Sequence, residues 1–369
     1  MSGAWWLGLP GALIWWATLA APWRPWSTRE HLEPDGPRPE ADLSQVTALI
    51  PARDEAAVIG RTLAALTAQG RGLQVVVVDD QSGDETAAIA RDFAGVAVLA
   101  GRPLPAGWAG KLWALEQGLG EVRTPLTLLL DADIELAPGL LPALAAHKLR
   151  QGAALASLMA WLSQRSFWDR LLLPAFVYYF KLLYPFALAN AGRPRWLAAA
   201  AGGCVLVDTA ALRGLGGFAG LRDALIDDCT LAMRLKRAGN RTWVGLSRGV
   251  ISLRPYGSLA SIQQMVVRSA FTQLRYSTGL LLLVTAVFAA AYWLPLAALA
   301  LPGARTLGAA ALAAMALSYL PVLRYYRRSL GWALLLPLTG TLFLAMTWSS
   351  ALRYWRGVRS QWKGRSYAR

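Results

Sequence analysis

Three long apolar blocks in the C-terminal part of the chain most strongly limit what it can fold into. They cover roughly residues 277–301, 306–323 and 331–352, and a block of about 20 apolar residues is long enough to cross a bilayer. The whole chain is 55% hydrophobic with a formal net charge of +15, which is typical of a membrane protein that meets anionic lipid. Nucleic-acid binding is disfavoured, because the apolar residues stand in long blocks instead of lying between basic ones.

A further uncharged run occupies residues 3–21. No Lys or Arg precedes it, so it lacks the basic start of a signal peptide, and Arg24 and Arg29 follow it. We expect an uncleaved membrane anchor over residues 1–23, with the following domain in the cytoplasm. A cleaved signal peptide is the alternative. The two cysteines exclude a disulfide framework and fit a reducing compartment.

The number of membrane spans stays open. Arg324, Arg327 and Arg328 follow the second block, and the tail 353–369 is basic without an acidic residue. Both clusters should be cytoplasmic, yet one full block separates them. The block 331–352 is therefore re-entrant, or another block does not cross the membrane.

The region from 44 to 250 shows the alternation of an α/β domain. Predicted strands begin at 44 and cover 73–80, 96–101 and 125–133, and predicted helices cover 55–69, 84–94 and 111–120. Strands that are apolar on both faces favour a mostly parallel central sheet covered by helices on both sides. The remaining segments are a linker (24–43), a juxtamembrane segment (251–276), transmembrane helices (277–352) and a basic tail (353–369).

Two of the predicted strands end in paired carboxylates. Asp79 and Asp80 follow a run of four valines, and Asp131 and Asp133 follow "LTLLL". In such sheets ligands bind beyond the carboxyl ends of the strands. Carboxylates this close repel one another unless a cation lies with them, and Mg²⁺ or Mn²⁺ prefers such oxygen ligands. The alternatives are a helix cap after the first pair and a plain turn after the second.

The motifs "IPARDE", "VVVVDDQSGDET" and "DAD", in this order and spacing, resemble the family 2 glycosyltransferases with a GT-A fold over residues 46 to about 276. The resemblance implies a UDP-sugar donor and a Mg²⁺ or Mn²⁺ ion on Asp133 and Asp131. It assigns the nucleotide sugar to Pro51, Arg53, Glu55, Asp79, Asp80, Lys111 and Asp131.

An acidic pair, Asp227 and Asp228, precedes a helical pattern that continues from Leu231. Sugar transfer needs a base for the acceptor hydroxyl, and the resemblance implies Asp228 in this role. Asp227, Gly202 and Gly203 would lie on the acceptor side, where glycine lets a ligand approach the backbone. The alternatives are charge complementarity with the helix dipole and a kinked strand.

Processive members of the family carry Q-x-x-R-W near the membrane, whereas this chain reads "TQLRY" with Thr272 at the glutamine position. We therefore do not expect polymer synthesis. Arg275 would still pair with the leaving pyrophosphate, since guanidinium groups bind phosphate oxygens well. Its alternative role is contact with lipid headgroups.

Residues 166–189 are apolar nearly all round but contain charges and prolines, which suits a membrane-interfacial segment. A buried core helix is the alternative. Together with "GWAGKLWAL", "RDALIDDC", "SLRPY" and "WKGRSY", this stretch resembles the hopene-associated glycosyltransferases of bacterial hopanoid gene clusters, nearly end to end.

The second resemblance implies a multi-pass enzyme of the bacterial inner membrane with a cytoplasmic catalytic domain, a lipid or isoprenoid acceptor and contact with membrane lipids. One base and a direct displacement predict inversion at the anomeric carbon. Two other classes stay open. One is a catalytically silent membrane scaffold or lipid carrier. The other is a nucleotidyltransferase, which needs a glycine-rich triphosphate loop that "PARDEAAVIG" lacks.

Overall fold

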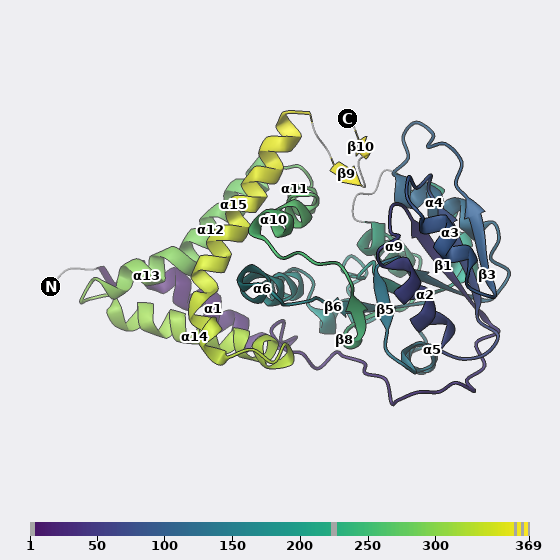
Figure 1. The fold of residues 1–369 in the computed structure, drawn as a ribbon. Helices are drawn as coiled ribbons and strands as arrows, with labels where there is room; N and C mark the ends of the chain where they lie inside the picture. The colour runs from purple at the N-terminus through teal and green to yellow at the C-terminus, as the bar shows by residue number, and fades with distance from the viewer. Residues whose placement is uncertain (1–3, 223–226, 358–359, 363–364, 368–369) are drawn as a thin grey trace.

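The computed structural model describes residues 4–222, 227–357, 360–362 and 365–367, and shows an α/β body joined to an arm of apolar helices (Figure 1). The strands of the body are β1 Val46–Ala52, β2 Gln74–Asp79, β3 Val96–Ala100, β4 Leu126–Leu130, β5 Ile134–Leu136, β6 Leu155–Trp161, β7 Cys204–Asp208 and β8 Thr242–Ser252. Its helices are α2 Ile59–Thr67, α3 Thr86–Arg91, α4 Gly110–Leu119, α5 Leu140–Gln151, α7 Phe186–Asn190, α8 Thr209–Gly214, η2 Ala219–Leu221 and α9 Asp227–Arg237.

Three helices lie between the body and the arm: α6 Phe167–Leu183, α10 Leu259–Val267 and α11 Ala270–Gln273 (Figure 1). The arm consists of η1 Ala4–Leu7, α1 Leu9–Ala20, α12 Thr278–Phe288, the π-helical η3 Ala289–Trp293, α13 Leu294–Leu299, α14 Arg305–Tyr325, η4 Leu330–Leu335 and α15 Leu336–Trp355. Two short antiparallel strands, β9 Ser360–Trp362 and β10 Arg365–Tyr367, follow it.

The eight strands of the body form one sheet in the order β3-β2-β1-β4-β7-β6-β8-β5. β3, β2, β1 and β4 are parallel, as the sequence predicts. However, β7 runs antiparallel to both β4 and β6, and β5 is antiparallel to β8. β6 and β8 are parallel to each other, so the second half contains both strand directions. The sheet is therefore mixed, whereas the sequence predicts a mostly parallel one. The chain leaves the sheet after β6, passes through α6 and α7, and re-enters as β7 from the end at which the parallel strands finish.

The central strands are buried on both faces, because successive side chains point to opposite sides. On β1, Ala48 and Ile50 share a core with Leu63 of α2, whereas Leu49 shares the opposite core with Leu115 of α4. β2 and β4 alternate in the same way. Burial on both faces explains why these strands are continuous apolar runs in the sequence.

Three helical segments in the described part of the arm are long and apolar enough to cross a membrane: Thr278–Leu299, Arg305–Tyr325 and Leu330–Trp355. They correspond to the three apolar blocks of the sequence. α15 lies beside α12 and η3 in the opposite direction. Trp348 donates a hydrogen bond to Thr285 at 3.0 Å, and Trp293, eight residues after Thr285, donates to Thr341, earlier in α15, at 2.9 Å.

The N-terminal span that the sequence predicts for residues 1–23 is not shown. α1 has 12 residues, a length of about 18 Å, whereas the apolar layer of a bilayer is about 30 Å thick. α1 packs along α14 (Figure 1), and Trp15 donates its indole N–H to the carbonyl of Ala291 at 2.7 Å.

The predicted linker and juxtamembrane segments are both integrated into the fold. In the linker 24–43, the N–H of Leu32 donates to the carbonyl of Leu246 in β8 at 2.9 Å. The segment 251–276 completes β8 and then forms α10 and α11. The α/β body thus extends past the predicted boundary at residue 250.

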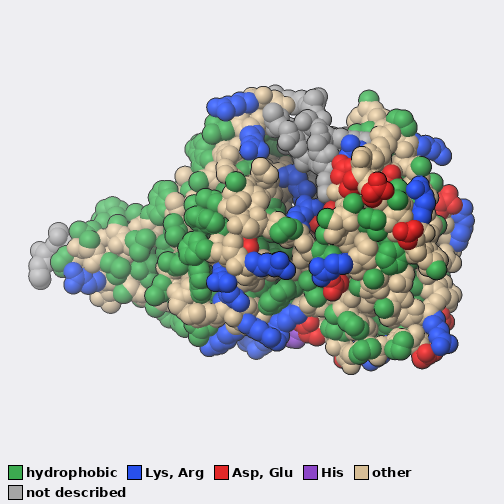
Figure 2. Space-filling view, viewed as in Figure 1, with side chains coloured by type: hydrophobic (Ala, Val, Ile, Leu, Met, Phe, Trp, Pro, Cys, Tyr) green, Lys and Arg blue, Asp and Glu red, His purple; other side chains and the backbone are tan. Residues whose placement is uncertain are grey.

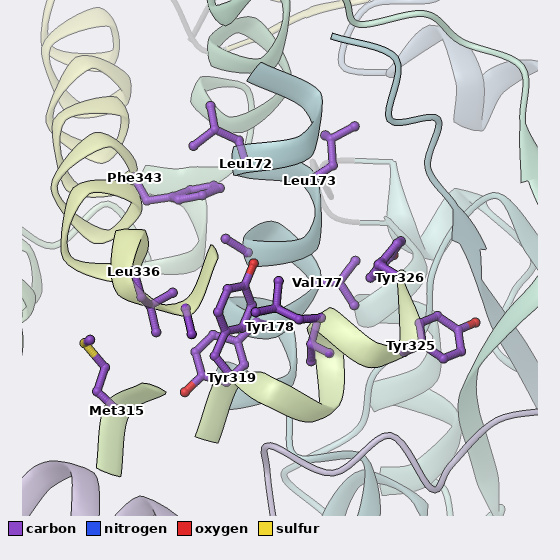
Figure 3. Packing of buried hydrophobic residues seen from close by; sticks show 14 of the residues in the cluster. Leu172, Leu173, Val177, Tyr178, Met315, Tyr319, Tyr325, Tyr326, Leu336 and Phe343 are labelled. Atoms are coloured by element: carbon purple, nitrogen blue, oxygen red, sulfur yellow. The ribbon is translucent and has the colours of Figure 1, made fainter. Parts of the chain in front are cut away.

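α6 joins the arm to the body and is mostly buried within the protein. The hydroxyl of Tyr178 lies 2.6 Å from that of Ser318 in α14, and Tyr178 also packs against Tyr319 and lies near Phe343 of α15 (Figure 3). These contacts match the alternative of a buried core helix within 166–189. Contact of this segment with a membrane surface stays a prediction.

The ends of α14 and α15 are both hydrogen-bonded to segments outside the arm. Ser350, close to the end of α15, accepts the N–H of Phe271 in α11 at 3.1 Å. Tyr325, beside the arginine cluster 324–328, accepts a hydrogen bond from Arg248 of β8 at 2.9 Å. Figure 2 shows apolar side chains covering the arm, with Lys and Arg gathered mainly where the arm meets the body.

Asp169 fixes the start of α6 to the body, so its removal should destabilise the fold. Its carboxylate is 2% exposed and accepts the backbone N–H groups of Arg165, Ser166 and Gly257. We expect Asp169→Ala to lower stability by about 1–3 kcal/mol, because buried N–H groups lose their acceptor. A thermal unfolding scan in detergent should show a lower midpoint. The exposed Asp92→Ala is the control, and equal midpoints for the two variants would contradict the assignment.

Candidate functional site

One cavity of about 550 Å³ lies at the carboxyl ends of β1 and β4, between the starts of α4 and α9. In sheets of parallel strands, ligands bind at this end. Nine residues singled out in the sequence line it: Pro51, Glu55, Lys111, Asp131, Asp133, Gly202, Gly203, Asp227 and Asp228. The glycines reach it because β7 enters the sheet from this end.

Lys111, at the start of α4, is the cation of one side of the cavity. Its Nζ lies 2.7 Å from Asp131 Oδ1 and 4.0 Å from Asp227 Oδ2. Burial alone would lower the pKa of Lys111, but the carboxylates of Asp131, Asp227 and Asp228 outweigh burial and raise that pKa above its ordinary value. Lys111 therefore stays positively charged at neutral pH and links the ends of β4 and α9.

Arg254, two residues after β8, is the cation of the other side. Its Nε donates to Asp133 Oδ2 at 2.8 Å, and a terminal guanidinium nitrogen lies 3.8 Å from Glu55 Oε1. Burial would lower the pKa of Arg254, but Asp133 and the other nearby acidic groups raise it overall. Each aspartate of the D-x-D pair is thus bound to its own cation.

Asp228 is a half-buried carboxylate at the start of α9. Burial and the adjacent carboxylate of Asp227 raise the pKa of Asp228 to about 6, against the opposing effects of Lys111 and the N–H groups of Cys229 and Gly202. A Cβ at Gly202 would lie 3.2 Å from Asp228 Oδ2, so glycine keeps this side open. With a pKa of about 6, Asp228 is mostly ionised at neutral pH and can accept a proton.

A second group of predicted residues lies beside the cavity, where β1 and β2 end. Arg53 donates to the carbonyls of Asp80 and Gln81 and so fastens the two strand-end loops together. Asp80 is fully buried. Asp79 is half-buried, and its Oδ1 has no hydrogen-bond partner within the described part of the chain. Arg53, Asp79 and Asp80 are not among the cavity-lining residues but lie at the neighbouring strand ends.

The structure does not place Arg275 among the residues that line the cavity. It is exposed and sits in a left-handed turn after α11, with a φ of 51°. The next residue, Tyr276, stacks on Tyr354 of α15 with ring centroids 4.3 Å apart. The turn thus contacts the arm, and the cations of the described cavity lining are Lys111, Arg254 and Arg268.

Arg254, Tyr256 and Arg268 line the cavity but were not predicted as site residues. The first two belong to "SLRPY", and the N–H of Leu253 donates to the carbonyl of Asp133 at 2.8 Å, which brings this stretch beside the D-x-D pair. A strand that ends in charged residues is the signal that identified Asp79 and Asp131. The same signal is present at the end of β8, where Arg254 follows the strand. No sequence signal pointed to Arg268.

Comparison with family models matches part of the body. The model of "Glycosyl transferase family 2" matches residues 47–216. This range runs from β1 to just past α8 and includes both strand-end carboxylate pairs.

Among curated relatives, the 4,4'-diaponeurosporenoate glycosyltransferase of Staphylococcus aureus (strain MRSA252) is 35% identical over 89 residues, which is 24% of this chain and 24% of the relative. The matched stretch spans about a quarter of the length of the curated relatives.

Among solved structures, a mannosyltransferase from Pyrobaculum calidifontis in complex with GDP-Man and Mn²⁺ is similar with a TM-score of 0.53 and 20% identity, over 95% of this chain and 98% of that chain. At this identity the likeness establishes the fold alone, a GT-A-like fold. Within this fold, residues 47–216 match the family 2 glycosyltransferase model.

Proposed function

We propose that the protein is a membrane-bound, inverting glycosyltransferase that moves a sugar from a nucleotide sugar to the hydroxyl of a lipid-like acceptor. The observation that carries this proposal is one cavity shared by the D-x-D carboxylates, Asp131 and Asp133, and the proton acceptor Asp228. A leaving diphosphate and an attacking hydroxyl can therefore lie side by side in this cavity. The family 2 domain supports the reaction class.

The charges of the cavity suit a diphosphate that arrives with a divalent cation. Its described lining contains five acidic and three basic residues, so a diphosphate alone would meet excess negative charge. The oxygens of Asp133 and Asp131 are ligands that Mg²⁺ and Mn²⁺ prefer, and an ion bound there would neutralise charge on the leaving diphosphate. The described residues include no cluster of three or more ligating side chains. Donor phosphates would have to complete the coordination.

The chemical step is a direct displacement. The acceptor oxygen bonds to the anomeric carbon while the bond from that carbon to the diphosphate breaks, and the hydroxyl proton passes to Asp228. Lys111 and Arg254 are positive groups fixed where charge develops on the leaving diphosphate. The nucleoside would lie at the ends of β1 and β2, against Pro51, Arg53, Glu55, Asp79 and Asp80. A single displacement inverts the anomeric centre.

The arm supports a membrane-borne acceptor. Its three apolar helical segments are long enough to cross a bilayer. The end of α14 is hydrogen-bonded to β8, and the end of α15 is hydrogen-bonded to α11. We therefore place the body in the cytoplasm of a bacterial inner membrane, with α15 re-entrant and with α1 in the same apolar layer as α14. Both basic clusters then obey the positive-inside rule. The proposed acceptor class is a hopanoid or related isoprenoid. One relative of this chain is named 4,4'-diaponeurosporenoate glycosyltransferase.

Asp228→Asn tests the base. We expect transfer to fall by about 10²–10⁴-fold, because proton transfer by a positioned base contributes that much, while nucleotide-sugar binding stays near normal. Mass spectrometry of lipid products in reconstituted membranes would measure transfer, and calorimetry would measure binding. Asp92→Asn is the matched surface control. Lost donor binding in a folded Asp228→Asn protein would instead make Asp228 a donor-binding residue.

The pH profile tests the same residue independently. A base works only when ionised, so kcat/KM should fall about tenfold per pH unit below pH 6, where Asp228 becomes protonated. Asp227→Asn removes the like charge that raises the pKa of Asp228, and should move this acid limb to lower pH. An acid limb at the same pH in both proteins would contradict the pairing.

Arg254→Ala tests how the D-x-D pair meets a metal ion. In the donor-free protein a metal ion held by Asp133 would have to compete with the guanidinium of Arg254, which is bound to Asp133 Oδ2. We expect the variant to bind Mn²⁺ roughly tenfold more tightly without donor, since a charge-assisted hydrogen bond contributes about 1.5 kcal/mol. Titration followed by electron paramagnetic resonance would measure free Mn²⁺. Arg268→Ala is the control. Equal Mn²⁺ affinity in Arg254→Ala and the unmodified protein would show that the ion pair does not restrict the site.

A further inference from the structure

The cavity has a second, apolar part that the transfer chemistry does not use. Beyond the carboxylates, its walls are formed by Met159 and Leu162 at the end of β6, Phe176 and Phe180 of α6, and Met265 of α10. We call this part the apolar slot. A nucleotide sugar is mostly polar and charged, so these five apolar side chains together suit a more apolar ligand.

α6 presents its cavity face and its arm face on opposite sides. Phe176 and Phe180 are one helical turn apart and share a side, and both are only half-buried. Tyr178 points the other way into the arm, where it is fully buried against Tyr319 (Figure 3). The two phenylalanine rings thus leave apolar surface open to the cavity, although the helix itself is fixed by packing.

α10 forms another wall of the cavity and offers both polar and apolar side chains to it. Ser261, Gln264, Met265 and Arg268 line it from one helix face, at the spacing i, i+3, i+4 and i+7. Gln264 and Arg268 are exposed. The end of α10 is tied to the arm, because Ser350 of α15 donates to the carbonyl of Val267 at 2.6 Å. The slot therefore lies at the junction of the body and the apolar arm.

We propose that the apolar slot binds the hydroxyl-bearing end of a lipid alcohol, with its apolar body against Phe176 and Phe180 and its hydroxyl toward Asp228. This inference rests on the proposed function and specifies its acceptor subsite. The whole cavity, donor side included, has a volume of about 550 Å³, which is in the range that holds one drug-sized ligand. Only the reactive end of the acceptor enters beside the donor sugar, and the remainder of the lipid stays in the apolar layer of the arm.

The test uses the full chain in phosphatidylethanolamine and phosphatidylglycerol liposomes, with a diazirine-bearing farnesol as photoreactive probe. We expect labelled peptides from α6 and α10, and competition by unlabelled bacterial lipid extract. The double variant Phe176→Trp, Phe180→Trp fills the slot and should reduce this labelling at least fivefold. Phe167→Trp is the control, because Phe167 is on the same helix, 54% exposed and outside the cavity lining.

Calorimetry with UDP- and GDP-sugars separates the slot from the donor site. Nucleotide-sugar binding that survives in the double variant, together with lost labelling, supports the slot. Labelling confined to the arm helices, or unchanged in the double variant while the donor still binds, overturns the slot alone. A folded protein that binds no nucleotide sugar overturns the proposed function itself.

A second variant covers the case in which the double substitution does not fold. Phe180→Ala removes a ring from the slot and should raise labelling by a bulkier, ring-fused diazirine alcohol relative to the farnesol probe at least threefold. An unchanged ratio between the two probes would overturn the role of Phe180.

Discussion

The pairing of crowded carboxylates with internal cations is the interaction on which the site depends. Two strand ends and one helix start bring acidic groups into one cavity, where they would repel one another without compensation. Lys111 binds Asp131 and lies near Asp227, and Arg254 binds Asp133. These ion pairs hold the carboxylates in place and keep positive charge where a diphosphate would leave. They also set the electrostatic surroundings in which Asp228 can act as a base near neutral pH.

The second constraint is that one helix serves both the site and the arm. α6 packs Tyr178 into the arm (Figure 3) and turns Phe176 and Phe180 toward the cavity. Asp169 anchors its start to the loop after β8, the same loop that carries Arg254. The position of the apolar arm helices and the shape of the proposed acceptor slot are therefore coupled through the same packed residues.

The first half of the sheet was predictable from sequence, because β1, β2 and β4 are buried on both faces and read as apolar runs that end in charge. The reversal at β7 was not, since strand direction depends on where the chain re-enters after α6 and α7, which no local pattern encodes. The cavity carboxylates followed from the strand ends. Arg254 did not, because its place beside Asp133 depends on the pairing of β5 with β8. The apolar content of residues 3–21 predicted a span, yet α1 is short and packs against α14.

The most direct test of the account is the release of nucleoside diphosphate by the full protein in liposomes, with a panel of UDP- and GDP-sugars, Mg²⁺ or Mn²⁺, and bacterial lipid extract added or omitted. The account predicts release from one donor that rises strongly when lipid extract is present, with a glycosylated lipid in the mass spectrum. Release that is equally fast without lipid extract would contradict a lipid-like acceptor. The absence of release from every donor by folded protein would contradict the proposed glycosyl transfer from a nucleotide sugar.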